Sequence, residues 1–247
     1  MYNPYQLTGK TILITGASSG IGRATAIECP KMGAKLILTA RNEERLKATL
    51  DSLEGSDHQM IVADLTLQSD VDSLVNLSPV LDGLVNDAGI TITKPITFIR
   101  QDDLDKVLGI NTFAPIMLTK TLLKKRKISN GASIVMVSSL ASKTVAPGNA
   151  VYGISKSAIK TFAQYCALEV ANKGIRVNSI HPGMVDSEMT RNLSFSQEEL
   201  ELDKKHYPLK RYGNPEEIAW SIIYLLSDAT KWVTGTQLVI DGGAHLV

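Results

Sequence analysis

The sequence predicts a doubly wound α/β fold, with a parallel sheet of about seven strands and helices on both faces. The composition of the 247 residues, 44% hydrophobic and 21% charged, supports a large core. Short apolar runs alternate with helix-length segments along the whole chain, which is the order that builds a parallel sheet. Several of these runs are apolar throughout, as expected for strands buried on both faces.

Seven segments have the length and composition of strands, and helical stretches lie between them. The strands are predicted over residues 11–15, 35–39, 59–63, 83–85, 133–137, 175–180 and 237–240. The clearest helices are predicted over residues 42–53, 102–123, 152–173 and 215–226. No linker or internal repeat interrupts this order, so we expect one domain over residues 1–247.

Two segments depart from the regular pattern. Pro30 falls inside the first helix and should end or kink it early, because proline lacks the N–H that the helix needs. Residues 187–209 are polar and charged, and Pro208 lies near their end. We expect these residues to form a flap beside the site rather than part of the core.

Charge and residue usage exclude several classes of function. The net charge of +1 gives no field for nucleic acid or an anionic membrane, and the basic run at 124–127 is interpreted as a solvated helix end. Cys29 and Cys166 are far apart and are expected to be free thiols in the core of a reduced, cytoplasmic protein. The four histidines lack metal-ligand spacing, so no metal is predicted. We see neither a signal peptide nor a membrane-spanning run, and expect a small-molecule partner.

A glycine-rich loop follows the first predicted strand and opens a helix, which is the context of a dinucleotide-phosphate site. Gly16 allows a tight turn, Gly20 lets the backbone approach a pyrophosphate, and Gly22 permits close helix–strand contact. The helix amino terminus adds free N–H groups and a favourable dipole. The spacing is Gly-x-x-x-Gly-x-Gly, unlike a P-loop, and glycines at such positions also serve ordinary turns.

Tyr152 and Lys156 lie four residues apart in a predicted helix and therefore share one face. A nearby ammonium favours tyrosinate, so we expect the pKa of Tyr152 to fall below its usual value of about 10. Such a phenol can donate a proton to a carbonyl or accept one from an alcohol. Ser138 and Ser139 follow a predicted strand, at the sheet edge where ligands bind; we expect Ser139 to contact substrate and Ser138 to be structural. Taken alone, a Tyr-x-x-x-Lys pair also occurs on ordinary surfaces.

Together these motifs resemble those of the short-chain dehydrogenase/reductase family, and the resemblance covers essentially the whole chain. The matching motifs occur in the family's order, and they are the loop at 15–22, Asp64-Leu65, Asn86-Asp87-Ala88-Gly89, Asn111, Ser139, Tyr152 with Lys156, Pro182-Gly183 and Asp241-Gly242-Gly243. The resemblance implies a Rossmann-like fold. It also implies an oxidoreductase that transfers a hydride between a nicotinamide and a carbonyl or secondary alcohol.

The resemblance also implies a role for each matching residue. Tyr152 would be the general acid/base, Ser139 would polarise the substrate carbonyl, and Lys156 would bind the nicotinamide ribose and lower the tyrosine pKa. Asn111 would help to hold a proton-relaying water, which completes the catalytic set. The implied cofactor-binding residues are Gly16, Ser18, Ser19, Gly20, Ile21, Gly22, Arg41, Asp64, Leu65, Asn86, Ala88, Gly89, Tyr152, Lys156, Pro182, Gly183, Val185 and Ser187. Among them, Asp64 would contact the adenine ring and Pro182, Gly183 and Val185 the nicotinamide.

One motif departs from the family pattern. The family usually has Asn-Asn-Ala-Gly after the fourth strand, and here the second residue is Asp87, which keeps an acceptor but loses the amide donor. We expect this change to affect local stability more than activity. Within the family, the segment 182–190 and the compact length most resemble 3-oxoacyl-[acyl-carrier-protein] reductases.

The end of the second strand predicts the cofactor. NAD-specific sites of this kind place an acidic residue there, on the adenosine ribose. This chain has Thr39 and Ala40, followed by Arg41, whose guanidinium can bind a 2′-phosphate. We therefore expect NADP(H) rather than NAD(H). The alternative is that Arg41 is a solvated charge paired with Glu43 or Glu44.

The sequence is also compatible with two other functions, and it leaves the oligomeric state undecided. One is a catalytically quiet nucleotide-binding regulatory protein on the same fold, and the other an epimerase or dehydratase, although those relatives carry a separate substrate domain. The resemblance also implies a homotetramer, or a homodimer. Its contacts would come from the helix face near Ala158, Phe162 and Cys166 and from the last strand. The alternative is that this face only covers the sheet.

Overall fold

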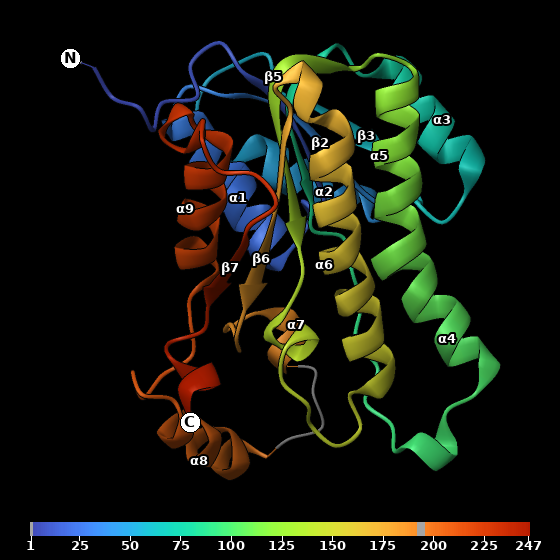
Figure 1. The fold of residues 1–247 in the computed structure, drawn as a ribbon, viewed down its shortest axis with the longest axis vertical. Helices are drawn as coiled ribbons and strands as arrows, with labels where there is room; N and C mark the ends of the chain where they lie inside the picture. The colour runs from blue at the N-terminus through green and yellow to red at the C-terminus, as the bar shows by residue number, and fades with distance from the viewer. Residues whose placement is uncertain (1, 192–195) are drawn as a thin grey trace.

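The computed structural model describes residues 2–191 and 196–247, and its centre is one seven-stranded parallel sheet (Figure 1). The strands lie in the order β3-β2-β1-β4-β5-β6-β7. This confirms the predicted fold class. The strands are β1 (Thr11–Thr15), β2 (Lys35–Ala40), β3 (Gln59–Val62), β4 (Leu81–Asn86), β5 (Ile128–Val137), β6 (Arg176–Pro182) and β7 (Gln237–Ile240).

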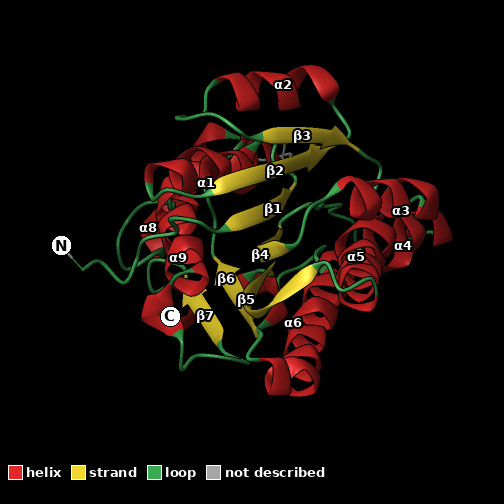
Figure 2. Ribbon diagram, turned by 90° about the horizontal axis from the view of Figure 1, so that it is seen from above, coloured by secondary structure: helices red, strands yellow, loops and turns green. Residues whose placement is uncertain are grey.

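Helices cover both faces of the sheet (Figure 2). One buried cluster lies on the side of α1, α2 and α9, and the other on the side of α3, α5 and α6. The helices are α1 (Gly20–Lys31), α2 (Glu43–Asp51), α3 (Gln68–Leu77), α4 (Gln101–Leu108), α5 (Ala114–Lys124), α6 (Ala150–Val170), α7 (Glu188–Arg191), α8 (Gln197–His206) and α9 (Pro215–Leu226).

The strand order reverses between β1 and β4, which creates a crevice at the carboxyl ends of these strands. Thr15 ties the two ends together, because its Oγ1 accepts hydrogen bonds from the backbone N–H groups of Asp87 and Ala88 at 3.0 and 3.1 Å. Gly16 follows with a positive φ of 69°, and a Cβ there would lie 2.9 Å from the Ala88 nitrogen. This close approach requires glycine.

The helix predicted over residues 102–123 is interrupted in the structure. Five residues between α4 and α5, Gly109–Phe113, form a π-helical turn (η2) that contains Asn111. Pro115 supplies a physical reason, because it has no N–H to donate to the carbonyl of Asn111 four residues earlier. Such wide turns inside helices are frequent at functional sites.

The structure confirms the prediction for Pro30 and departs from the prediction for residues 187–209. As predicted, α1 ends at Lys31, one residue after Pro30. The segment 187–209 is more regular than expected, since it carries α7 and α8. Helix α8 starts with a capping box in which Ser196 accepts from the Glu199 N–H and Glu199 accepts from the Ser196 N–H. Residues 192–195, which also belong to this segment, lie outside the described residues.

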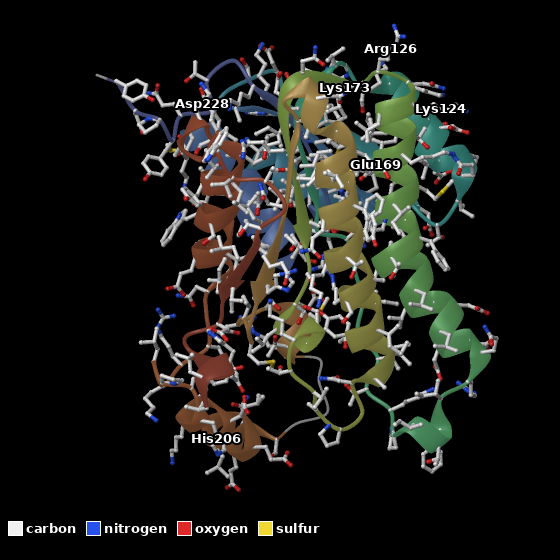
Figure 3. All side chains as sticks on the ribbon, in the orientation of Figure 1. Lys124, Arg126, Glu169, Lys173, His206 and Asp228 are labelled. Atoms are coloured by element: carbon white, nitrogen blue, oxygen red, sulfur yellow. The ribbon has the colours of Figure 1, made fainter. Side chains whose placement is uncertain are left out.

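The basic run at 124–127 starts with the last residue of α5, Lys124, and continues into the turn that follows, so it lies at a helix end as predicted. Lys124 and Arg126 project at the end of the molecule opposite α8 (Figure 3). Lys125 donates to Asn76 Oδ1 at 2.8 Å and Lys127 to the Ser78 carbonyl at 2.5 Å. Both cysteines are free and buried, as expected of core thiols. Across the described part of the chain, no helix is long and apolar enough to cross a membrane.

Candidate active site

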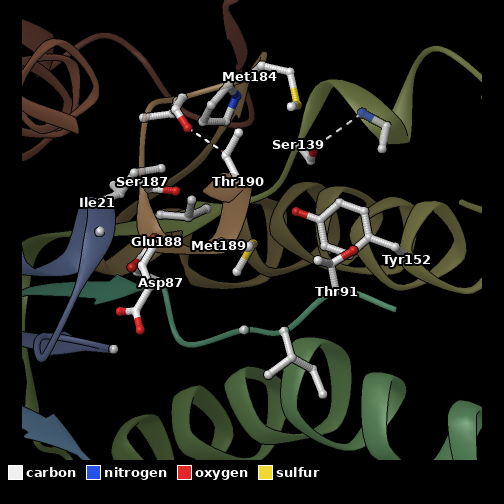
Figure 4. Close-up of a pocket in the computed structure, with 18 of the residues that line it drawn as sticks. Ile21, Asp87, Thr91, Ser139, Tyr152, Met184, Ser187, Glu188, Met189 and Thr190 are labelled. Atoms are coloured by element: carbon white, nitrogen blue, oxygen red, sulfur yellow. Dashed lines mark hydrogen bonds between the residues drawn. The ribbon is translucent and has the colours of Figure 1, made fainter. Parts of the chain in front are cut away.

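A cavity of about 1170 Å³ lies at the carboxyl ends of the strands (Figure 4). Most of the residues predicted from the sequence line it. They are Gly16, Ser18, Ser19, Gly20, Ile21, Arg41, Leu65, Ala88, Gly89, Ser139, Tyr152, Lys156, Pro182, Gly183, Val185 and Ser187. Of the other predicted residues, Gly22, Asp64, Asn86 and Asn111 lie outside the lining. The fold therefore brings together, around one cavity, predicted site residues that are far apart in the chain.

The phosphate loop presents backbone donors to the cavity. Ser19 precedes α1 with an extended conformation and makes no side-chain capping bond, and the first turn of the helix has no acidic residue. Neither Ser19 nor the first turn of the helix therefore caps these N–H groups, and Asp87 interacts with only one of them, that of Gly22. Gly22 stands behind them, and a Cβ there would lie 2.5 Å from the Gly16 carbonyl oxygen. The loop fits the phosphates of a dinucleotide.

Ser139 and Tyr152 project into the same cavity from different elements (Figure 4). Tyr152 lies in the first turn of α6, and Ser139 begins the short 3₁₀ turn η3 (Leu140–Ser142). Ser139 Oγ accepts from the Ala141 N–H at 3.1 Å, so its own proton is not used within this turn. Ser138 is buried and donates to the Lys156 carbonyl at 2.8 Å, a structural contact as expected.

The expectation that Lys156 lowers the pKa of Tyr152 is wrong. Burial raises the pKa of Tyr152 to about 12; a hydrogen bond with Ser139 opposes the rise, and the charge of Asp87 adds to it. Lys156 Nζ lies 5.8 Å from the centre of the Tyr152 ring and donates to the Val137 carbonyl at 2.9 Å. Burial lowers the pKa of Lys156 to about 8, although the charge of Asp87 opposes this. Tyr152 is therefore a protonated phenol at neutral pH.

Asn111 lies behind the cavity wall and is buried. Its Oδ1 accepts from the Ile90 N–H and its Nδ2 donates to the Ile90 carbonyl, both at 2.8 Å. Its Nδ2 also donates to Ser155 Oγ at 3.0 Å, and Ser155 donates to the Tyr152 carbonyl at 2.7 Å. Asn111 thus joins the loop after β4 to the helix that carries Tyr152 and Lys156.

Asp87, the departure from the family pattern, lines the cavity. Its Oδ2 lies 2.7 Å from the position that a Cβ on Gly22 would occupy, so the carboxyl group packs against the phosphate loop. Burial raises the pKa of Asp87 to about 6, while the charge of Lys156 and the Gly22 N–H oppose the rise. Asn86 beside it is buried and donates to Thr119 Oγ1 at 3.3 Å, so it belongs to the sheet rather than the cavity.

The end of β2 forms the far wall of the cavity. Arg41 lines it and has its guanidinium 3.9 Å from Asp64, so it pairs with that carboxylate and not with Glu43 or Glu44. Partial burial raises the pKa of Asp64, but hydrogen bonds from Thr66 and the charge of Arg41 outweigh it and lower the pKa. Thr39 also lines the cavity, and its Oγ1 is buried without a hydrogen-bond partner in the described chain.

Sequence reasoning missed an ion pair at the mouth of the cavity. Arg45 of α2 donates to both carboxylate oxygens of Glu188 in α7, with NH1 3.2 Å from Oε1. Both residues line the cavity, and with Ser18, Ser19 and Gly20 they also line a smaller hollow of about 270 Å³ outside it. The pair therefore bridges the groove beside the phosphate loop. A contact between residues 143 positions apart leaves no local pattern in the sequence.

Comparisons with known proteins agree with this geometry. A family model described as Enoyl-(Acyl carrier protein) reductase matches residues 16–245. A 3-oxoacyl-[acyl-carrier-protein] reductase from Rickettsia felis is 36% identical over 241 residues, which are 98% of this chain and 99% of that protein. The structure of a putative gluconate dehydrogenase from Agrobacterium tumefaciens matches with a TM-score of 0.92 and 29% identity over 100% of both chains.

A 3-ketoacyl-(acyl-carrier-protein) reductase from Brucella melitensis, solved in complex with NADH, matches with a TM-score of 0.88 and 26% identity over 97% of this chain and 99% of that one. The fold and site define a Rossmann-like oxidoreductase acting on CH–OH or C=O groups. The chain belongs to the short-chain dehydrogenase/reductase family. An enzyme is therefore favoured over a catalytically quiet regulatory protein.

Proposed function

We propose that the protein is an NADP(H)-dependent reductase of 3-oxoacyl thioesters, with Tyr152 as the proton donor. One observation carries the proposal: Ser139, Tyr152 and Lys156 border one cavity, and the uncapped amino terminus of α1 borders the same space. A bound nicotinamide dinucleotide supplies the hydride. The loop 16–21 would hold its pyrophosphate, Lys156 its nicotinamide ribose, and Pro182, Gly183, Val185 and Ser187 the nicotinamide end.

The protonated state of Tyr152 supports the direction of carbonyl reduction. A phenol with a pKa of about 12 carries its proton at neutral pH and can deliver it to the carbonyl oxygen while the carbonyl carbon accepts the hydride. The hydroxyl of Ser139, which forms a hydrogen bond with Tyr152, can donate its proton to the same oxygen.

Tyr152→Phe tests this assignment. We expect turnover to fall at least about a hundredfold, the scale of a lost general acid, with NADPH binding nearly unchanged. Tyr5→Phe, which changes an exposed tyrosine that does not line the cavity, is the control. Near-full activity in Tyr152→Phe would refute the assigned mechanism.

The substrate class is supported by the relatives and by the lining of the cavity. The Rickettsia felis relative is named for 3-oxoacyl-[acyl-carrier-protein] reduction, and Leu140, Met184, Met189 and Leu202 give the cavity an apolar portion suited to an acyl chain. An absorbance screen with NADPH should show turnover of 3-oxoacyl thioesters ahead of sugars, ketosteroids and simple ketones. Preferred turnover of a sugar acid, as the name of the Agrobacterium neighbour suggests for that protein, would refute this choice.

Arg41 and Ala40 support NADP(H) as the cofactor. Both line the cavity, and Arg41 offers a forked donor set to a 2′-phosphate where an acidic residue would repel it. We expect kcat/KM to favour NADPH by at least about tenfold, equivalent to about 1.4 kcal/mol. The double variant Ala40→Asp, Arg41→Ser should reverse the preference, whereas Arg100→Ser, an exposed arginine elsewhere, should not. An advantage for NADH in the natural chain, the cofactor in the Brucella structure, would show that Arg41 is misassigned.

Exposed apolar side chains support assembly into a homotetramer or homodimer. Cys166 is buried and Phe162 packs on the core, so those two predicted contact residues cover the sheet. The same helix exposes Ile154, Tyr165 and Leu168 instead, and β7 is an edge strand. Light scattering at micromolar concentration should give a tetramer or dimer, and a monomer would refute the proposal. The buried free thiols fit a reducing cytoplasm.

A further inference from the structure

A buried chain of polar side chains lies behind the cavity wall and leads from β6 to the turn that begins with Ser139. His181 of β6 is completely buried. Its Nδ1 lies 2.8 Å from Ser142 Oγ, and its Nε2 lies 2.9 Å from Ser179 Oγ. Ser142 Oγ in turn donates to the Ser139 carbonyl oxygen over 2.7 Å. His181 is therefore linked to Ser139 through one intervening hydroxyl.

The oxygen atoms that face Nδ1 decide which ring nitrogen carries the proton. Besides Ser142 Oγ, the Ser139 carbonyl oxygen lies 3.3 Å from Nδ1, and a carbonyl can only accept. The single proton of Ser142 is directed at that same carbonyl, so its oxygen is free to accept from Nδ1–H. The Ser179 hydroxyl lies 2.9 Å from Nε2 and 3.3 Å from the Thr236 carbonyl, so Nε2 is its nearer acceptor. The chain then runs in one direction: Ser179 donates to Nε2, Nδ1 donates to Ser142, and Ser142 donates to the Ser139 carbonyl.

The surroundings keep the ring neutral, as this chain requires. Burial lowers the pKa of His181 to about 4; the hydrogen bond to Ser139 opposes the fall, and the charges of Lys143, Lys160 and Lys156 add to it. A second ring proton would remove the acceptor at Nε2 that the Ser179 hydroxyl uses. A neutral imidazole has one donor and one acceptor, which matches its two serine neighbours.

We propose that His181, protonated at Nδ1, is a positioning residue that fixes the turn 139–142 and so directs the Ser139 hydroxyl into the cavity. The turn is a single turn of 3₁₀ helix, too short to be stable through its own hydrogen bonds. Ser139 Oγ accepts from the Ala141 N–H within this turn, so any rotation of the turn redirects the hydroxyl. This role rests on the proposed function in one respect, that Ser139 contacts the substrate.

Nitrogen-15 NMR of histidine-labelled protein at pH 7 tests the tautomer without any substrate or cofactor. The resonances of His181 are assigned by their loss in His181→Asn. We expect a protonated Nδ1 and an unprotonated Nε2. A proton at Nε2 alone would overturn the proposal because Ser142 would then lose its donor, and protons on both nitrogens would overturn it because Ser179 would lose its nearer acceptor, Nε2.

Matched substitutions test the positioning role. His181→Asn keeps an N–H donor near Nδ1 and should retain kcat within about threefold, whereas His181→Leu removes the donor and should lower kcat about tenfold or more. KM and the Kd for NADPH should change by less than about threefold in both. Ser142→Ala breaks the same link with less disturbance and should lower kcat as His181→Leu does. His58→Asn is the control, because His58 lies just before β3, far from this turn in the fold, and its Nδ1 accepts from the Leu36 N–H of β2.

The outcomes separate this proposal from the proposed function. Full kcat in both His181→Leu and Ser142→Ala would overturn the positioning role. An equal loss in His181→Asn and His181→Leu, at equal melting temperatures, would also overturn it, because the donor would then not matter. If the natural chain reduces no carbonyl substrate, the proposed function fails while the NMR measurement still decides the tautomer.

Discussion

Asp87→Asn should stabilise the protein, and the gain should depend on pH. Burial raises the pKa of Asp87 from 3.8 to about 6, and the opposing attraction of Lys156 is already contained in that value. A carboxyl whose pKa is raised on folding contributes stability that is present below pH 3.8 and lost as the pH rises through about 6. An asparagine keeps the acceptor beside Gly22 and has no charge to bury.

The magnitude follows from linkage. The shift corresponds to about 3 kcal/mol at neutral pH, of which about 2 kcal/mol is lost between pH 4.5 and 7.5. Because the carboxylate borders the open groove, solvent screens its charge, and we expect about half of this pH-dependent free energy to be observed. The variant should therefore gain about 1 kcal/mol more at pH 7.5 than at pH 4.5, or roughly 2–4 °C in Tm for a chain of this size.

Thermal unfolding at the two pH values, followed by circular dichroism, measures this difference directly. Asp51→Asn, which changes an exposed carboxylate of α2, is the matched control and should show no such pH-dependent gain. An equal change in Tm at both pH values would refute the reasoning, because it would mean that Asp87 does not titrate in this range.

Three further outcomes are expected. Arg176 is buried and donates to the Leu225 and Ser227 carbonyls and to Thr230 Oγ1, so Arg176→Met should lower the free energy of unfolding by about 3 kcal/mol; urea unfolding would contradict this with a loss below about 1 kcal/mol. Glu188→Gln should speed NADPH release about two- to fivefold at low salt and not at high salt, with Asp186→Asn as the control in stopped-flow fluorescence. Amide exchange in the described parts of the flap, residues 187–191 and 196–209, should slow when cofactor and substrate bind, and equal protection in both states would count against a flap.

Local patterns predicted the fold and most of the candidate site. Strand β7 was predicted with its observed bounds, because a short apolar run between turn residues is a local signal. Helix α8 was missed although Ser196 and Glu199 form a capping box, since its polar sequence hides the helical period. The raised pKa of Tyr152 could not be predicted, because it depends on burial and on Asp87, and neither follows from the spacing to Lys156.

The bridge between Arg45 and Glu188 sets how readily the groove admits a molecule. An exposed ion pair stabilises the bridged state by less than about 1 kcal/mol. At about 1 kcal/mol the bridge is broken in roughly one molecule in six at any moment. If about 100 Å² of apolar contact closed the groove instead, it would contribute about 2.5 kcal/mol, and the groove would be open in only about one or two molecules in a hundred. Charge on both walls thus leaves the entrance open in a much larger fraction of molecules than apolar closure would.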